Sequence, residues 1–257
     1  MTSSSIHAGD ATVPQTGDVL VQASGVAWSW GEGGGNGVTR VDMALHRGRI
    51  TGFLGRNGAG KTTTIKLLAG VLVPQRGTIT VCGMPSWSSS ARARVGWAPE
   101  EPPVVAGMSV REHLLTARAL AAQAPGPGRS VDDVVAALDL GAVVGRLAGS
   151  LSKGTRQRLG IAMALCGAPD VLLLDEPTAG LDPAQVEGLR QLIRAEAARG
   201  TAVLLSSHVT AELAAVADDV VAINAGCTVF VGPIAALDEA TRAALATSAS
   251  SSSMGAA

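Results

Sequence analysis

The stretch GRNGAGKTT, residues 55–63, matches the phosphate-binding pattern G-x-x-x-x-G-K-S/T. Its glycines let the backbone fold tightly, so that successive N–H groups from about Asn57 to Thr62 point toward phosphate oxygens. The Lys61 ammonium would reach the β- and γ-phosphates of a nucleotide, and the Thr62 hydroxyl would ligate Mg²⁺. An ordinary glycine-rich turn is the competing interpretation, but the apolar run before the loop and the helical pattern after it favour a nucleotide site. The predicted nucleotide-binding residues are Gly55, Asn57, Gly58, Ala59, Gly60, Lys61, Thr62 and Thr63.

Two carboxylates and a histidine follow other apolar runs. Asp175 and Glu176 come directly after VLLL, and His208 comes directly after AVLLSS. Near a triphosphate, one carboxylate can take part in the coordination shell of Mg²⁺, and a second can accept a proton from an attacking water. The two acids could instead cap the turn at Pro177, and a lone histidine is more often a surface or core residue. Beside a phosphate loop, we expect Asp175 to bind metal, Glu176 to be the catalytic base and His208 to assist catalysis by sensing the γ-phosphate.

Three short apolar runs would position these groups: ITGFLG (50–55), VLLLD (171–175) and AVLLSS (202–207). Each run is followed by a loop and a helix-like stretch, which is typical of buried parallel strands. Ligands gather at the carboxyl edge of such a sheet, so the three polar ends should converge on one site.

The region 104–165 has helix signals and little strand character, which predicts a helical subdomain inserted between strands. Ser109, Ser130 and Ser152 are expected to begin helices, the first with a capping box completed by Glu112. Gly141 is expected to end the second of these helices.

The third helix opens with LSKGTRQR, residues 151–158, a second element suited to anions. Ser152, Gly154 and Thr155 lie at the helix start, where backbone N–H groups are free to hold a negative charge. A plain helix cap is the competing interpretation of Ser152. A cap followed by a first helical residue also accounts for Asp182 and Pro183.

The bulk composition limits the classes of function. The 257 residues suffice for one large core, or for one domain with an inserted subdomain. A net charge of −1 argues against broad electrostatic capture of nucleic acid. Three widely spaced cysteines without a metal-ligand pattern indicate a reducing compartment.

The first residues have neither the basic start nor the apolar core of a secretory signal, and no apolar run approaches the roughly 18 residues of a membrane span. We expect a soluble, cytoplasmic protein with a domain over residues 19–246 and flexible tails at 1–18 and 247–257.

Six motifs occur in a fixed order: GRNGAGKTT, WAPEEP, LSKGTRQR, VLLLDEP, AGLD and the histidine of SSH. Together they resemble the nucleotide-binding subunits of ATP-binding cassette (ABC) transporters, over about residues 19–237. The resemblance implies an α/β fold, a P-loop NTPase with a mostly parallel sheet core, a small antiparallel β subdomain and the inserted helical subdomain. It also implies ATP and Mg²⁺ as ligands.

LSKGTRQR is similar to the signature of this family, usually LSGGQ, which completes the ATP site of a second subunit. The resemblance therefore implies two subunits that close head-to-tail over two ATP molecules, with Ser152, Gly154 and Thr155 of one contacting the γ-phosphate held by the other. It also adds Asp182 to the nucleotide site. In this chain Lys153 and Thr155 replace the commoner Gly and Gln. We expect a homodimer, although the resemblance is equally compatible with a pair of different subunits.

Two further site residues come from the same resemblance. An aromatic residue upstream of the phosphate loop should stack on adenine, and Trp30 matches better than Trp28, with core or rim packing as the alternative for either. Glu100 stands where most members carry a glutamine that touches Mg²⁺, with Glu101 as the alternative register. A glutamate there keeps a hard oxygen ligand but adds negative charge near the γ-phosphate.

Glu100 and the SKG of the signature are similar to an exporter-type branch of the family. Such subunits bind a separate multi-span membrane permease, and here Pro102, Pro103 and Val104 would line the receiving groove, unless they form a plain surface loop. We therefore predict an ATPase that powers an exporter of drugs, lipids or similar cargo, peripheral on the inner face of the cell membrane and independent of nucleic acid. A soluble, non-transport ABC ATPase of a protein machine or cluster-assembly system is the alternative.

Overall fold

The computed structural model describes residues 19–31, 37–121, 126 and 128–237. The predicted tails at 1–18 and 247–257 lie outside these residues. The strands are β1 (Val19–Ser29), β2 (Gly37–His46), β3 (Ile50–Leu54), β4 (Arg76–Val81), β5 (Met84–Pro85), β6 (Val95–Ala98), β7 (Val171–Leu174), β8 (Ala202–Ser207), β9 (Asp219–Asn224) and β10 (Cys227–Pro233). The α-helices are α1 (Lys61–Leu68), α2 (Ser89–Arg92), α3 (Val110–Leu120), α4 (Val131–Ala137), α5 (Lys153–Leu165), α6 (Pro183–Ala198) and α7 (Thr210–Ala214), and the 3₁₀ turns are η2 (Gly141–Val143), η3 (Ala148–Ser150) and η4 (Ile234–Ala236).

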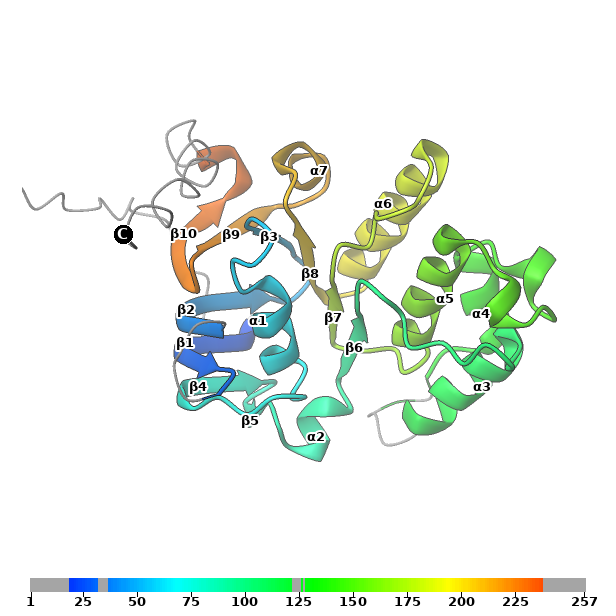
Figure 1. Cartoon of the computed structure of the whole chain (residues 1–257), viewed down its shortest axis with the longest axis horizontal. Helices are drawn as coiled ribbons and strands as arrows, with labels where there is room; N and C mark the ends of the chain where they lie inside the picture. The colour runs from blue at the N-terminus through cyan, green and yellow to red at the C-terminus, as the bar shows by residue number, and fades with distance from the viewer. Residues whose placement is uncertain (1–18, 32–36, 122–125, 127, 238–257) are drawn as a thin grey trace, which may run out of the picture.

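Within the described residues the strands form one mixed sheet of ten, in the order β5-β4-β1-β2-β10-β9-β3-β8-β7-β6. Strands β9, β3, β8, β7 and β6 run parallel to one another, whereas β1, β2, β4 and β5 pair antiparallel. The antiparallel strands lie at one end of the molecule and helices α3, α4 and α5 at the other (Figure 1). The predicted combination of a parallel core, a small antiparallel part and helices is confirmed.

The parallel strands are buried on both faces. Every residue of β3, β7 and β8 is buried, which explains their continuous apolar character. Successive residues face opposite sides of a strand, so β7 and β8 contribute alternately to two cores. One core includes Leu172, Leu174, Val203 and Leu205, and the other includes Val171, Leu173, Ala202 and Leu204.

The three expected strands are confirmed as neighbours. Strand β8 pairs in parallel with β3 on one side and with β7 on the other. Their carboxyl ends therefore lie side by side, and the residues that follow, Gly55, Asp175 and His208, leave the sheet at the same edge.

In the sequence, helices α3, α4 and α5 lie between β6 and β7, whereas in the sheet the two strands are neighbours (Figure 1). Ser109 caps α3 in a capping box with Glu112, and Ser130 caps α4, as predicted. The expectation for Gly141 is wrong, because α4 ends at Ala137 and Gly141 begins the turn η2. Asp139 takes the left-handed conformation at this helix end (φ 49°), and the Leu140 N–H reaches back to the Val135 carbonyl at 2.9 Å, so an aspartate does what a glycine usually does.

In the described part of the chain, no helix combines the length and the apolar character needed to span a bilayer.

Candidate active site

The phosphate loop leaves β3 at Gly55 and returns as the first turn of α1 at Lys61. Gly58 and Gly60 have positive φ angles of 82° and 106°, the region that favours glycine. A side chain at Gly60 would also collide with Val38, since an added Cβ would lie 2.7 Å from Val38 Cγ1. Gly60 occupies the cap position of α1 and has no side chain with which to satisfy the first N–H groups of the helix. The loop therefore presents backbone donors to an anion.

A cavity of about 410 Å³ opens beside this loop. It is bounded by the phosphate loop and by residues that follow β1, β6 and β7. The lining residues are Trp30, Gly37, Arg56, Asn57, Gly58, Gly60, Lys61, Thr62, Thr63, Glu100, Asp175 and Glu176. Of the predicted loop residues, Gly55 and Ala59 do not line the cavity, and Ala59 is buried behind it.

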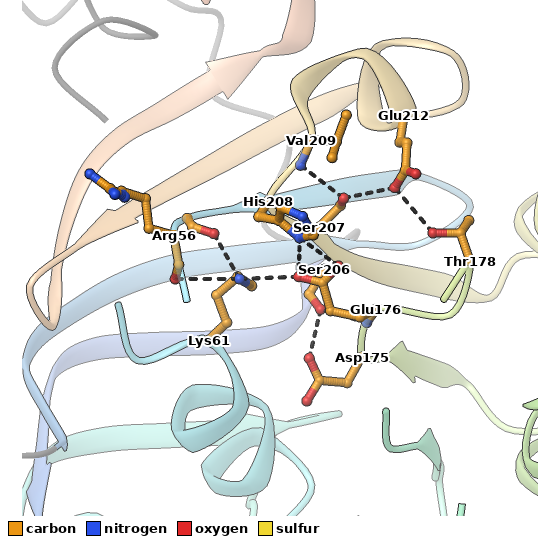
Figure 2. Close-up of polar contacts among 11 residues, drawn as sticks. Arg56, Lys61, Asp175, Glu176, Thr178, Ser206, Ser207, His208, Val209 and Glu212 are labelled. Carbon is orange, nitrogen blue, oxygen red and sulfur yellow. Dashed lines mark hydrogen bonds and ion pairs between the residues drawn. The ribbon is translucent and has the colours of Figure 1, made fainter. Parts of the chain in front are cut away.

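Lys61 and Glu176 form an ion pair across the cavity floor. The Lys61 ammonium lies 3.1 Å from Glu176 Oε1 and donates to the Gly55 carbonyl at 2.7 Å. Both side chains are largely buried, with 6% and 13% of their surface exposed. Figure 2 shows this ion pair. A phosphate in the loop would compete with Glu176 for the Lys61 ammonium. Sequence reasoning assigned both residues but missed their contact, because it depends on the order of strands in the sheet.

Ser206 on β8 holds the two acids. Its hydroxyl donates to Asp175 Oδ1 at 2.7 Å and accepts the Glu176 N–H at 2.9 Å. Glu176 itself has a left-handed backbone (φ 44°), which is unfavourable for a non-glycine residue and is held here by these contacts. No pattern in the sequence distinguished Ser206 from its neighbours in AVLLSS.

The other oxygen of Asp175 is available for a cation. Asp175 is 1% exposed, and its Oδ2 is buried without a hydrogen-bond partner in the described structure. A buried, unpartnered carboxylate oxygen is unfavourable unless a cation satisfies it. Thr62 and Glu100 line the same cavity, whereas Glu101 does not, which favours Glu100 in the choice of register. Among the described residues no three His, Cys, Asp or Glu side chains cluster as a metal site, so a metal ion here would also need hydroxyl or phosphate oxygens.

His208 lies against the carboxylate of Glu176. Its Nδ1 is 3.2 Å from Glu176 Oε2, and about half of the imidazole is exposed (Figure 2). The ring does not line the cavity, but it contacts the acid that does. Histidine and carboxylate, predicted separately from two strand ends, thus meet in one site.

Trp30 lies at the rim of the cavity with 55% of its surface exposed. Trp28 packs against the core and meets Trp30 edge to face, with ring centroids 4.3 Å apart. The Lys66 ammonium is 6.0 Å from the centre of the Trp30 ring. Trp30, and not Trp28, is therefore the tryptophan placed to meet a planar ligand.

The start of α5 does not line this cavity. Ser152 caps the helix by accepting the Thr155 N–H at 3.2 Å, and the two side-chain hydroxyls are 2.8 Å apart. Gly154 packs so tightly on the loop after β7 that an added Cβ would lie 2.7 Å from the Gly180 carbonyl oxygen. The first turn of α5 contains no acidic residue, so no carboxylate there opposes the partial positive charge of the helix start. Asp182 caps α6 through the Gln185 N–H at 2.9 Å, as predicted, and also lies outside the cavity lining.

In sequence, the chain is similar to one known family and to the ATP-binding proteins of several transporters. The family described as "ABC transporter" matches residues 38–179. The bacitracin transport ATP-binding protein BcrA of Bacillus licheniformis is 37% identical over 193 residues, which cover 74% of this chain and 62% of that protein. The Nod factor export ATP-binding protein I of Burkholderia lata is 37% identical over 205 residues, covering 79% and 67%. The lantibiotic transport ATP-binding protein SrtF of Streptococcus pyogenes is 33% identical over 184 residues, covering 70% and 77%.

Solved structures show the same fold. An ATP-binding subunit of an ABC transporter superposes with a TM-score of 0.75 at 25% identity, over 83% of this chain and 90% of that one. CbiO1 from Clostridium perfringens superposes with a TM-score of 0.70 at 24% identity, over 84% and 89%.

Proposed function

The chain belongs to the ABC transporter family, and from this premise we propose that it is the ATP-hydrolysing subunit that powers a membrane exporter. The observation that carries the proposal is the meeting of Lys61, Glu176 and His208 at a cavity walled by a phosphate loop. A loop of this kind binds nucleotide phosphates, and a carboxylate held by a histidine is suited to take a proton from water.

The chain's own groups account for hydrolysis of ATP. Lys61 and the N–H groups of the loop hold the phosphates, and Trp30 stacks on the adenine. Glu176, oriented by His208, accepts the proton of the attacking water. Thr62, Asp175 and Glu100 fit Mg²⁺, which when bound would neutralise phosphate charge. Catalysis of this type rests on positioning and on charge neutralisation rather than on covalent chemistry.

We place the start of α5 over the nucleotide of a second copy. Ser152, Gly154 and Thr155 are uninvolved in the chain's own cavity, and the helix start attracts anions. Asp182 lies close to the start of α5, because Gly154 packs against Gly180 and Leu181 in the loop that leads to Asp182. Closure of two copies would then depend on the γ-phosphate, and its loss on hydrolysis would loosen the pair.

Export is favoured by the relatives, whose names refer to transport of bacitracin and lantibiotics and to export of Nod factors. The chain spans 62% of the length of the bacitracin transport protein. The proposed assembly contains two copies of this chain and a multi-span permease, which places the protein on the inner face of the cell membrane. We propose drugs, lipids or similar cargo, chosen by the permease.

Co-purification from native membranes tests the transporter assignment. Val105, next to the proposed permease groove at residues 102–104, is 57% exposed, and Val231 on β10 is 56% exposed. We expect the wild-type chain and a Val231→Asp control to be recovered with a multi-span membrane protein, and Val105→Asp to lose that partner while it keeps ATPase activity. Recovery of an active ATPase from the soluble fraction, with no membrane protein attached, would instead support the non-transport alternative.

A further inference from the structure

Glu212 connects the two loops that carry the catalytic pair, although it lies outside the cavity. It stands in the first turn of α7, four residues after His208. Its Oε2 accepts a hydrogen bond from Ser207 Oγ at 2.8 Å and another from Thr178 Oγ1 at 3.1 Å. Ser207 immediately precedes His208, and Thr178 follows Glu176 by two residues. One carboxylate oxygen therefore joins the end of β8 to the loop after β7 (Figure 2).

The hydrogen-bond directions in this connection are fixed. A carboxylate oxygen accepts hydrogen bonds, so the one hydroxyl hydrogen of Ser207 is donated to Glu212, while Ser207 Oγ accepts the Val209 N–H at 3.0 Å. The chain of donors runs from the Val209 N–H through Ser207 to Glu212, and Thr178 donates to Glu212 from the other side. The backbone on both sides of His208 is thereby tied to the loop of Glu176.

Helix α7, which carries Glu212, packs tightly against the sheet. Leu213, the next residue, is fully buried. An added Cβ on Gly52 of β3 would lie 3.1 Å from Leu213 Cδ1, which shows how closely α7 packs on the central strand. A carboxylate on a tightly packed helix can hold two loops at a fixed spacing, whereas a carboxylate on a mobile loop could not.

We propose that Glu212 is a positioning residue for ATP hydrolysis, which sets the distance and orientation of His208 toward Glu176 by binding Ser207 and Thr178 together. This inference rests on the proposed function. The 3.2 Å contact between His208 and Glu176 spans two loops, and Ser206 fixes only the start of the one after β7. Without Glu212, Ser207 and Thr178 are no longer joined, and Ser206, two residues before His208, is left to connect the two segments.

Steady-state kinetics of the full-length protein test the proposal. Glu212→Ala should lower kcat for ATP by roughly 10- to 100-fold, since a misplacement of about 1 Å can cost about 10²-fold in rate. It should leave KM for ATP within about twofold, because Glu212 does not line the cavity. Glu212→Gln should retain near wild-type kcat, because its amide oxygen can accept both hydroxyl bonds. Glu187→Ala, which removes an exposed glutamate of α6, is the matched control and should leave both constants unchanged.

A double-mutant cycle separates positioning from general stability. If Glu212 acts through His208, then Glu212→Ala should cost little further activity in a His208→Ala background. Ser207→Ala and Thr178→Val remove the two bonds singly and should each lower kcat, which keeps the test decisive if Glu212→Ala folds poorly.

Three results would overturn the proposal: wild-type kcat in Glu212→Ala, equal losses in Glu212→Gln and Glu212→Ala, or an undiminished loss in the His208→Ala background. A wild-type protein that hydrolyses no ATP would refute the proposed function itself, and with it the role of Glu212.

Discussion

Glu176→Gln is expected to bind ATP normally and to hydrolyse it about 10²- to 10⁴-fold more slowly than the wild-type protein, the range that general-base catalysis supplies. The amide keeps the size of the side chain and can still accept a hydrogen bond from Lys61, but it cannot take a proton from water. Removal of one negative charge from the cavity should leave affinity for ATP unchanged or slightly higher. Phosphate release measures the rate, and binding of a fluorescent ATP analogue measures the affinity.

The same variant should accumulate as an ATP-dependent dimer, because the γ-phosphate that holds the two copies persists. Light scattering with and without Mg·ATP measures this association. Glu187→Gln changes an exposed acid of α6 and should behave as wild type in every assay. Full ATP turnover by Glu176→Gln would remove Glu176 from the mechanism.

Lys61→Ala should lower affinity for ATP by roughly 10- to 100-fold, as expected for the loss of a charge-assisted hydrogen bond worth about 1.5–3 kcal/mol. Lys61 is buried and points into the cavity, so its contact with phosphate would be shielded from water. The variant also leaves Glu176 without its cation, which adds repulsion toward phosphate. Equilibrium binding of ATP measures the loss.

Arg40→Ala serves as the control for Lys61→Ala, because it removes an exposed cation of β2 that pairs with Asp42 and lies outside the cavity lining. Circular dichroism of both variants checks that the fold is kept. Unchanged ATP affinity in a folded Lys61→Ala protein would refute the assignment of the phosphate loop.

Much of the fold was predictable because local patterns agree with the tertiary structure. Strands β3, β7 and β8 were visible as apolar runs, since strands covered on both faces carry no alternation. Helix starts at Ser109, Ser130 and Ser152 were visible because a capping side chain acts within three residues. The end of α4 was not, because Asp139 adopts a conformation for which glycine is the usual signal.

The sequence predicted the residues of the site better than it predicted the contacts between them. Lys61, Glu176 and His208 were found from motifs, but their mutual distances depend on β8 lying between β3 and β7. Ser206 and Glu212 act through hydrogen bonds between segments about 30 residues apart, for which the sequence contains no periodic or compositional signal.

A mixing experiment tests most directly the central claim, that each nucleotide is held by one copy and covered by the other. Ser152→Asp keeps a good helix cap but brings a negative charge toward the partner's phosphates, and Ser130→Asp at the start of α4 is its control. Ser152→Asp and Lys61→Ala should each be nearly inactive alone, because each spoils both sites of its own dimer. Mixed in equal amounts they should regain about a quarter of wild-type ATPase activity, given random pairing and independent sites, since each mixed dimer has one intact site. Activity that never exceeds the sum of the separate variants would contradict the account.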